Sequence, residues 1–175
     1  NHGMVRDNDE LASNPWHYEM HSLGFNYRLT DIQCALGRSQ LSKLERFVKK
    51  REKLRDRYSI LLKKLGPYVK PIETIGSCKP AWHLAVALID FEKLGIQRVD
   101  VMRKLSDLGV GTQVHYIPVH KQPYYKMRYG KFTLRGCESY YSRCLSLPLW
   151  PDMTLAEVDF VVSTLADILG VKQKF

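Results

Sequence analysis

Apolar residues recur at helical spacing from position 30 to position 65, and this run is the clearest element that the sequence predicts. Thr30 caps its start, Gln33 completes a capping box, and Gly66-Pro67 ends it. At about 1.5 Å per residue the helix would be on the order of 50 Å long, well beyond the usual length of about 11–12 residues. We therefore expect a long connecting helix that spans two domains or an oligomer interface and bends or breaks near Gly37.

The rest of the chain alternates between short strands and helices. Residues 1–23 show little periodicity and predict a loop. Thr154 and Glu157 form a second capping box, and Gly170 ends the helix that follows. The further elements are a buried strand over 82–89, a helix over 99–108, a strand over 112–116, a helix over 138–145, a helix-free stretch over 147–151 and a last helix over 155–169. Few strands and segregated helices predict an α+β fold with helices packed on a small sheet.

Composition fits one ordinary globular domain with a sizeable core. The chain has 175 residues, of which 45% are hydrophobic and 26% charged. No apolar run reaches the ~18 residues of a membrane span, and no secretory segment is visible, so we expect a cytoplasmic protein without a membrane partner. The four cysteines contain no C-x-x-C pair, which favours reduced thiols. The scattered histidines near the start have no matching carboxylate or cysteine, so no metal site is predicted.

The net charge of +9 changes this picture only locally, because the basic residues concentrate between Lys43 and Lys64. The simplest interpretation is the solvated face of a long helix. An alternative is a surface that attracts an anionic ligand, either a nucleotide or a nucleic acid. The solvated face is the favoured interpretation of the two, so a nucleic-acid partner is not favoured.

Two polar segments are candidates for chemistry. Asn26 and Arg28 precede the predicted helix start, where free N–H groups and the helix dipole favour anions such as phosphate. From residue chemistry alone, the favoured interpretation is that Asn26 is a turn residue and Arg28 a surface cation. Downstream, Tyr116 and His120 lie in a dense stretch after a predicted strand, where a sugar or nucleotide can stack and accept hydrogen bonds. Aromatic packing beside a surface histidine is the alternative there.

Several common catalytic motifs are missing from the sequence. It contains no G-x-S-x-G, no P-loop and no H-E-x-x-H. No lysine stands out as a buried Schiff-base former, because most lie in the basic helix or in loops.

Three segments together resemble the DegT/StrS-type aminotransferases, which are pyridoxal-phosphate enzymes that aminate nucleotide-linked keto sugars. The matching segments cover nearly the whole chain in family order: Gly24-Phe25-Asn26-Tyr27-Arg28-Leu29-Thr30-Asp31-Ile32-Gln33-Cys34-Ala35-Leu36-Gly37, then residues 111–125 with His115-Tyr116-Ile117-Pro118-Val119-His120, and Leu145-Ser146-Leu147-Pro148-Leu149. Within the family the chain is most similar to 4-aminotransferases acting on UDP-linked 4-keto-6-deoxy-N-acetyl hexoses, as in pseudaminic acid precursor synthesis. Three residues depart from those common in the family, namely Cys34, Ala85 and Lys121. These departures weaken the substrate assignment more than the family assignment.

The resemblance implies that this chain is the C-terminal part of a fold-type I enzyme about twice as long. Residues 1–29 would be the tail of the large domain and a loop, 30–65 the connecting helix, and 66–175 the small α+β domain. The Schiff-base lysine and most of the pyridoxal-phosphate site would lie in the N-terminal part, so the chain alone would bind no cofactor, carry no catalytic residue and be inactive.

The resemblance also assigns roles to individual residues. Asn26 resembles the asparagine that reaches across a homodimer to the cofactor phosphate of the other subunit. Arg28 resembles a basic residue near the substrate's phosphates, and Tyr116 and His120 resemble residues that line the sugar-nucleotide pocket. The implied reaction moves an amino group from glutamate through pyridoxal phosphate to the 4-keto group of the nucleotide sugar. The alternatives are a basic nucleic-acid-binding module and a stand-alone regulatory domain derived from the enzyme.

Overall fold

The computed structural model describes residues 4–5, 16 and 18–172. The chain divides into two compact units with a boundary between residues 43 and 44. The first unit has a short antiparallel pair, β1 (Met4–Val5) with β2 (Glu19–Met20), where the sequence predicted only loop. It also contains helix α2 (Asp31–Leu41). The three-part division at positions 29 and 65 stays a prediction.

Helical structure fills most of the range predicted from 30 to 65, in two pieces. Helix α2 ends at Leu41, and α3 (Leu44–Lys63) begins after a turn at Ser42 and Lys43. The break therefore falls five residues after Gly37, which lies inside α2. At the turn the Ser42 hydroxyl donates to the Ser39 carbonyl over 2.8 Å, a local bond of the kind with which serine competes against helix continuation.

The second unit is built on a three-stranded antiparallel sheet in the order β3-β4-β5. Central strand β4 pairs Ile89 with Val69 of β3 on one side and Ala85 with Leu147 of β5 on the other. The strands are β3 (Val69–Pro71), β4 (Ala85–Ile89) and β5 (Cys144–Leu147), and the helices between and after them are α4 (Phe91–Leu94), α5 (Arg98–Asp107), η1 (Val119–Lys121), α6 (Pro123–Tyr129), α7 (Arg135–Tyr141) and α8 (Leu155–Leu169).

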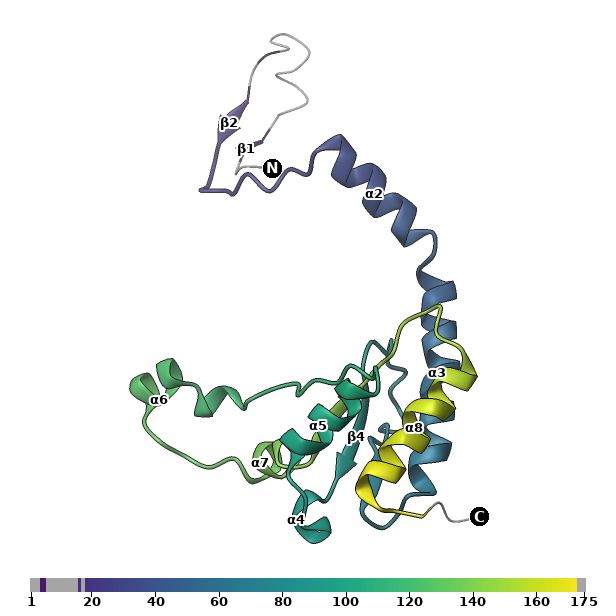
Figure 1. The fold of residues 1–175 in the computed structure, drawn as a ribbon. Coiled ribbons are helices and arrows are strands. Elements are labelled where there is room, and N and C mark those ends of the chain that lie inside the picture. Colours follow the sequence, from purple (N-terminus) through teal and green to yellow (C-terminus); the bar gives the residue numbers. More distant parts are fainter. Residues whose placement is uncertain (1–3, 6–15, 17, 173–175) are drawn as a thin grey trace. The chain divides into compact units, whose positions relative to one another are not determined.

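The core lies where α3, α5 and α8 meet the sheet (Figure 1). Residues at every second position of β4 are buried, which gives the sheet one inner face. Helix α3 buries one stripe against it, and α8 buries a wider stripe against both α3 and α5. The main contributors are Leu54, Tyr58, Leu61 and Leu62 of α3 and Val158, Val161, Val162 and Leu165 of α8. The predicted α+β fold, with helices on a small sheet, is confirmed.

Two element predictions were wrong. The strand predicted over 112–116 is reduced to one bridge between Gln113 and Ser146, because the Gln113 side chain takes up the Val114 amide. The helix predicted over 138–145 ends at Tyr141, and the residues after it form β5. All four residues of β5 are buried, so tertiary burial overrides the helical spacing there.

Candidate functional site

The loop before α2 presents both of its candidate residues to solvent. Asn26 and Arg28 are exposed, and the rings of Phe25 and Tyr27 stack with centroids 5.1 Å apart. The stack places the two rings on one side of the segment. Alternate residues of extended backbone point to opposite sides, so we expect Asn26 and Arg28 on the other side together. An amide and a guanidinium on one side of a loop make a donor pair for phosphate.

The capping box predicted at Thr30 forms, and it decides which donors remain for a ligand. The Thr30 amide donates to the Gln33 side chain over 3.0 Å, and the Gln33 amide donates to the Thr30 hydroxyl over 3.4 Å. Asp31 adds a negative charge in the first turn. Because the capping box engages the Thr30 and Gln33 amides, those two donors are taken, whereas the side chains of Asn26 and Arg28 remain for an anion.

A second set of candidates lies on the segment that leaves the sheet edge after Gln113. His115 is tied to the sheet, because its Nδ1 lies 2.8 Å from the hydroxyl oxygen of Ser146 on β5. Ser146 is only 4% exposed and also exchanges two backbone hydrogen bonds with Gln113. The rings of His115 and Tyr116 meet edge to face, with centroids 4.5 Å apart. Tyr116 itself is 71% exposed, so its ring and hydroxyl are available to a ligand.

His120 has a different environment from Tyr116. It is 6% exposed, its Nε2 lies 3.2 Å from Oε1 of Glu138 on α7, and its ring packs beside Phe132. Lys121 donates to the other oxygen of Glu138 over 3.1 Å. These two bonds, the one from His120 first, lower the pKa of the Glu138 carboxyl. While this network holds, Nε2 of His120 is engaged inside the protein.

Beyond η1 the segment continues into α6 at the far end of a projecting arm, residues 116–134 (Figure 1). Exposed aromatic side chains follow the arm, and the Tyr124 and Tyr125 rings lie edge to face at 5.2 Å. Arg128 donates to the Tyr124 hydroxyl over 2.9 Å. The arm therefore offers tyrosine faces and a cation, groups suited to a sugar or a base.

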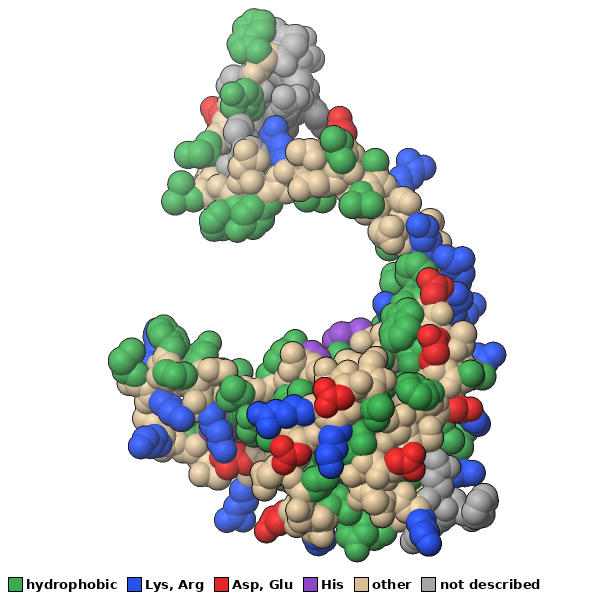
Figure 2. Space-filling view, in the orientation of Figure 1, with side chains coloured by type: hydrophobic (Ala, Val, Ile, Leu, Met, Phe, Trp, Pro, Cys, Tyr) green, Lys and Arg blue, Asp and Glu red, His purple; other side chains and the backbone are tan. Residues whose placement is uncertain are grey.

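The basic helix is partly neutralised by the fold. Arg57 forms a two-bond pair with Asp159 at 2.6 and 2.8 Å, and Lys50 pairs with Asp152 at 2.7 Å. Figure 2 shows acidic side chains among the blue ones along α3. These pairs join α3 to the start of α8 and to the turn before it. A mixed, partly paired surface favours the solvated-face interpretation over a nucleic-acid groove.

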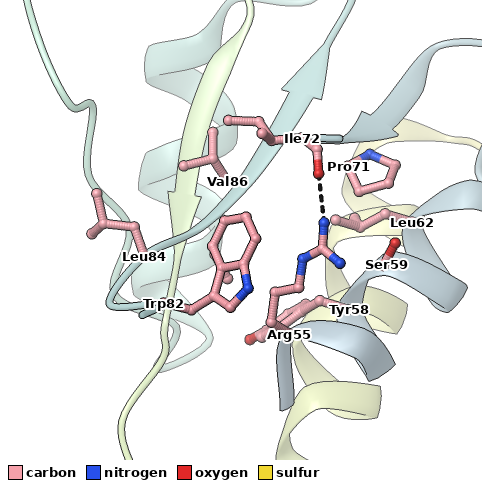
Figure 3. Close-up of a pocket in the computed structure, with 10 residues that line it drawn as sticks. Arg55, Tyr58, Ser59, Leu62, Pro71, Ile72, Trp82, Leu84 and Val86 are labelled. Carbon is pink, nitrogen blue, oxygen red and sulfur yellow. Dashed lines mark hydrogen bonds between the residues drawn. The ribbon is translucent and has the colours of Figure 1, made fainter. Parts of the chain in front are cut away.

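The hollow in Figure 3 is a structural joint rather than a ligand pocket. Arg55 and Trp82 point toward one another, with the guanidinium 4.5 Å from the ring centre, and Arg55 donates to the Ile72 carbonyl over 2.8 Å. The space between them is about 10 Å³, room for a single water molecule. A larger cleft of about 450 Å³ lies beside α8, between Gly109, Trp150 and Phe160.

The structure brings Tyr116 and His120 close along one segment, whereas Asn26 and Arg28 belong to the other unit. Two residues of the site were not predicted, Ser146 and Glu138. A polar residue between Leu145 and Leu147 was a usable signal for the first. Nothing local marks Glu138, whose partner His120 is 18 positions away.

In the part of the chain that the structure describes, no helix is long and apolar enough to cross a membrane. Among the same residues, no three histidine, cysteine or carboxylate side chains gather as a metal site would require.

Residues 1–166 match the model of the DegT/DnrJ/EryC1/StrS aminotransferase family. The spore coat polysaccharide biosynthesis protein SpsC of Bacillus subtilis (strain 168) is 35% identical over 173 residues, which are 96% of this chain and 44% of that protein. A UDP-4-amino-4,6-dideoxy-N-acetyl-beta-L-altrosamine transaminase of Campylobacter jejuni is 34% identical over 171 residues, or 98% of this chain and 45% of that protein.

Among solved structures, Helicobacter pylori PseC, an aminotransferase involved in the biosynthesis of pseudoaminic acid, superimposes with a TM-score of 0.81 at 27% identity. The match covers 97% of this chain and 44% of PseC. The chain thus spans 44–45% of the length of these relatives.

Proposed function

The chain belongs to the DegT/DnrJ/EryC1/StrS aminotransferase family, and from this premise we propose that it forms the C-terminal part of a pyridoxal-phosphate enzyme that aminates a nucleotide-linked sugar. The acceptor would be the 4-keto group of a UDP-linked 6-deoxy-N-acetyl hexose, and the donor glutamate. The observation that carries the proposal is that sugar transaminases match this chain over 98% of its length. Asn26 and Arg28 are exposed donors in the first unit, and Tyr116 is an exposed tyrosine in the second.

The residues present fit part of a cofactor site. Pyridoxal phosphate, when bound, supplies the electron sink that allows an amino group to leave glutamate and enter a ketone. The Asn26 side-chain amide, which is exposed, would donate to its phosphate in the subunit opposite its own. No lysine in the described part of the chain is buried as a coenzyme-bonding lysine would be. That lysine would lie in the part of the relatives that this chain does not match, so the chain alone would be inactive and cofactor-free.

The remaining residues would handle the nucleotide sugar. The Arg28 guanidinium would hold the diphosphate, for which its planar set of donors is suited. The Tyr116 ring would stack against the sugar or the base, and its hydroxyl would orient a substrate oxygen. His120 would support the wall of the same pocket, because its ring is buried in the protein and its Nε2 is bonded to Glu138. These contacts orient the substrate, while proton transfer at its C4 carbon belongs to the lysine.

A homodimer in the cytoplasm is part of the proposal, because Asn26 acts on the site of the other subunit. Exposed apolar side chains on the first unit support association. Phe25, Tyr27 and Ile32 are each more than 70% exposed, and no described residue of α2 is buried.

Amino transfer from glutamate to a UDP-linked 4-keto-6-deoxy-N-acetyl hexose tests the proposal, with mass spectrometry of the amino sugar as readout. The complete polypeptide that carries these residues, supplied with pyridoxal phosphate, should form product, and the 175-residue chain alone should form none. Arg28→Ala should raise the KM for the nucleotide sugar by about tenfold, and Asn26→Ala should weaken cofactor retention. Absence of product from the complete polypeptide would refute the function, and turnover by the chain alone would refute its inactivity.

A further inference from the structure

The stretch Tyr116–Val119 is held at both of its ends by side-chain contacts. On one side, His115 is bonded to Ser146 of the buried strand β5 at 2.8 Å. On the other side, His120 is bonded to Glu138 of α7 at 3.2 Å. Between these anchors Tyr116, Ile117 and Val119 are at least 50% exposed. The segment therefore has fixed ends and an outward-facing middle, the arrangement of a loop that presents side chains to a ligand.

Glu138 on α7 connects the two limbs of the arm, the segments that lead out to α6 and back from it. The outgoing limb carries η1, and the returning limb leads into α7 (Figure 1). Among the described residues, the hydrogen bonds and ion pairs between the outgoing limb and α7 all end on Glu138: Oε1 accepts from His120 and Oε2 from Lys121. Phe132 of the returning limb adds a ring contact to His120, with centroids 5.4 Å apart.

The chemistry of this joint favours a permanent contact. His120 is almost wholly buried, and Glu138 is the one side chain in the described part of the chain that its ring bonds to. Removing Glu138 would therefore leave Nε2 without that hydrogen bond in the interior. Both donors also lower the pKa of Glu138, which keeps the carboxylate ionised at neutral pH and able to accept both bonds. The arm beyond this joint contains only short helices, which do not stabilise themselves.

We propose that Glu138 is a positioning residue for the sugar-nucleotide half of the reaction. By holding His120 and Lys121 it fixes the far end of the Tyr116–Val119 segment and so keeps Tyr116 where the nucleotide sugar binds. The proposal rests on the function proposed above and deepens it. Glu138 would touch neither substrate nor cofactor, and it would have no part in the glutamate half of the reaction.

The first test uses the 175-residue chain itself and does not depend on activity. Amide hydrogen exchange is compared in wild type, Glu138→Ala and Glu92→Ala, a matched change at an exposed carboxylate on α4. We expect Glu138→Ala to speed exchange in residues 116–134 by about tenfold, while α3 and α8 exchange as in wild type. Unchanged exchange in the arm would overturn the proposal, and so would faster exchange throughout the core.

The second test uses the complete enzyme and separates the two half-reactions. Glu138→Ala should raise the KM for the nucleotide sugar by about tenfold and leave the glutamate half-reaction within about twofold of wild type. Glu138→Gln, which can still accept from His120 but no longer pairs with Lys121, should fall between the two, as should Lys121→Met. Glu92→Ala should match wild type.

The outcomes distinguish this inference from the function on which it rests. If wild type aminates the sugar but Glu138→Ala leaves its KM unchanged, or slows both half-reactions alike, the positioning role is wrong and the function stands. If wild type forms no amino sugar, the function is refuted together with the role in substrate handling, whatever the exchange experiment shows.

Discussion

The hydrogen bond between Tyr58 and Pro148 offers a sharp test of how the second unit is held together. Tyr58 of α3 is 2% exposed, and its hydroxyl donates to the Pro148 carbonyl over 2.9 Å. Pro148 directly follows β5, so this bond fastens the end of that strand to the helix. Burial raises the pKa of the Tyr58 phenol, so the hydroxyl stays protonated and remains a donor at any ordinary pH.

Tyr58→Phe removes the hydroxyl and keeps the ring. The change leaves the partly buried Pro148 carbonyl without its partner, which we expect to lower the free energy of unfolding by about 1–2 kcal/mol. The ring's own packing stays, so the loss should be well below the ~3–5 kcal/mol typical of truncating a large aromatic residue to alanine.

Urea unfolding followed by far-UV circular dichroism measures the difference. The midpoint should fall while the slope with urea stays that of wild type, because the same surface is exposed. Tyr68→Phe is the matched control, since Tyr68 is 37% exposed and its hydroxyl makes no hydrogen bond within the described residues. A loss below about 0.5 kcal/mol for Tyr58→Phe, the range of neutral surface changes, would refute the reasoning.

Three further predictions concern local contacts. Thr154→Ala removes the N-cap of α8 and should lower the free energy of unfolding by about 1 kcal/mol in the same assay. The Arg57 guanidinium holds the pKa of Asp159 below its usual value. The stabilisation from this pair is therefore complete above about pH 4 and is lost as the pH falls through the lowered pKa. Asp159→Asn should flatten this acid dependence of the urea midpoint. Burial raises the pKa of the Cys144 thiol, so iodoacetamide should label it only after unfolding, whereas mass spectrometry should find rapid labelling of the exposed thiols Cys34, Cys78 and Cys137.

Local rules predicted the capped helix ends, because the interactions that fix those ends span about three residues. The capping boxes at Thr30 and Thr154 both form, and Gly170 takes the left-handed conformation that ends α8. The apolar stripe of α8 is likewise buried as the spacing predicts. These features needed no knowledge of the partner elements.

The short strands escaped prediction because their partners are distant in sequence. β3 has three residues, and β5 pairs with a strand more than fifty positions earlier. All four residues of β5 are buried, so the strand lacks the alternation of apolar and polar positions by which periodicity separates strand from helix.

Separation in sequence also explains why the contacts of the site residues could not be predicted. Local chemistry marked Asn26, Arg28, Tyr116 and His120 as candidates and the family resemblance gave them roles, but their exposure and partners came only from the structure. The roles assigned to these four residues stay predictions. The partners of His115 and His120, at separations of 31 and 18 positions, could not be predicted from local sequence.

The joining of α3 to α8 has a consequence for folding speed. The pairs Arg57–Asp159 and Lys50–Asp152 each span 102 positions, and Tyr58 reaches Pro148 over 90. The intervening chain must close as one large loop before these contacts form, and the entropy of that closure is lost in advance of the contacts' gain. The second unit should therefore refold more slowly than its helix content alone would indicate. Its free-energy barrier to folding should be set by the docking of α8 on α3.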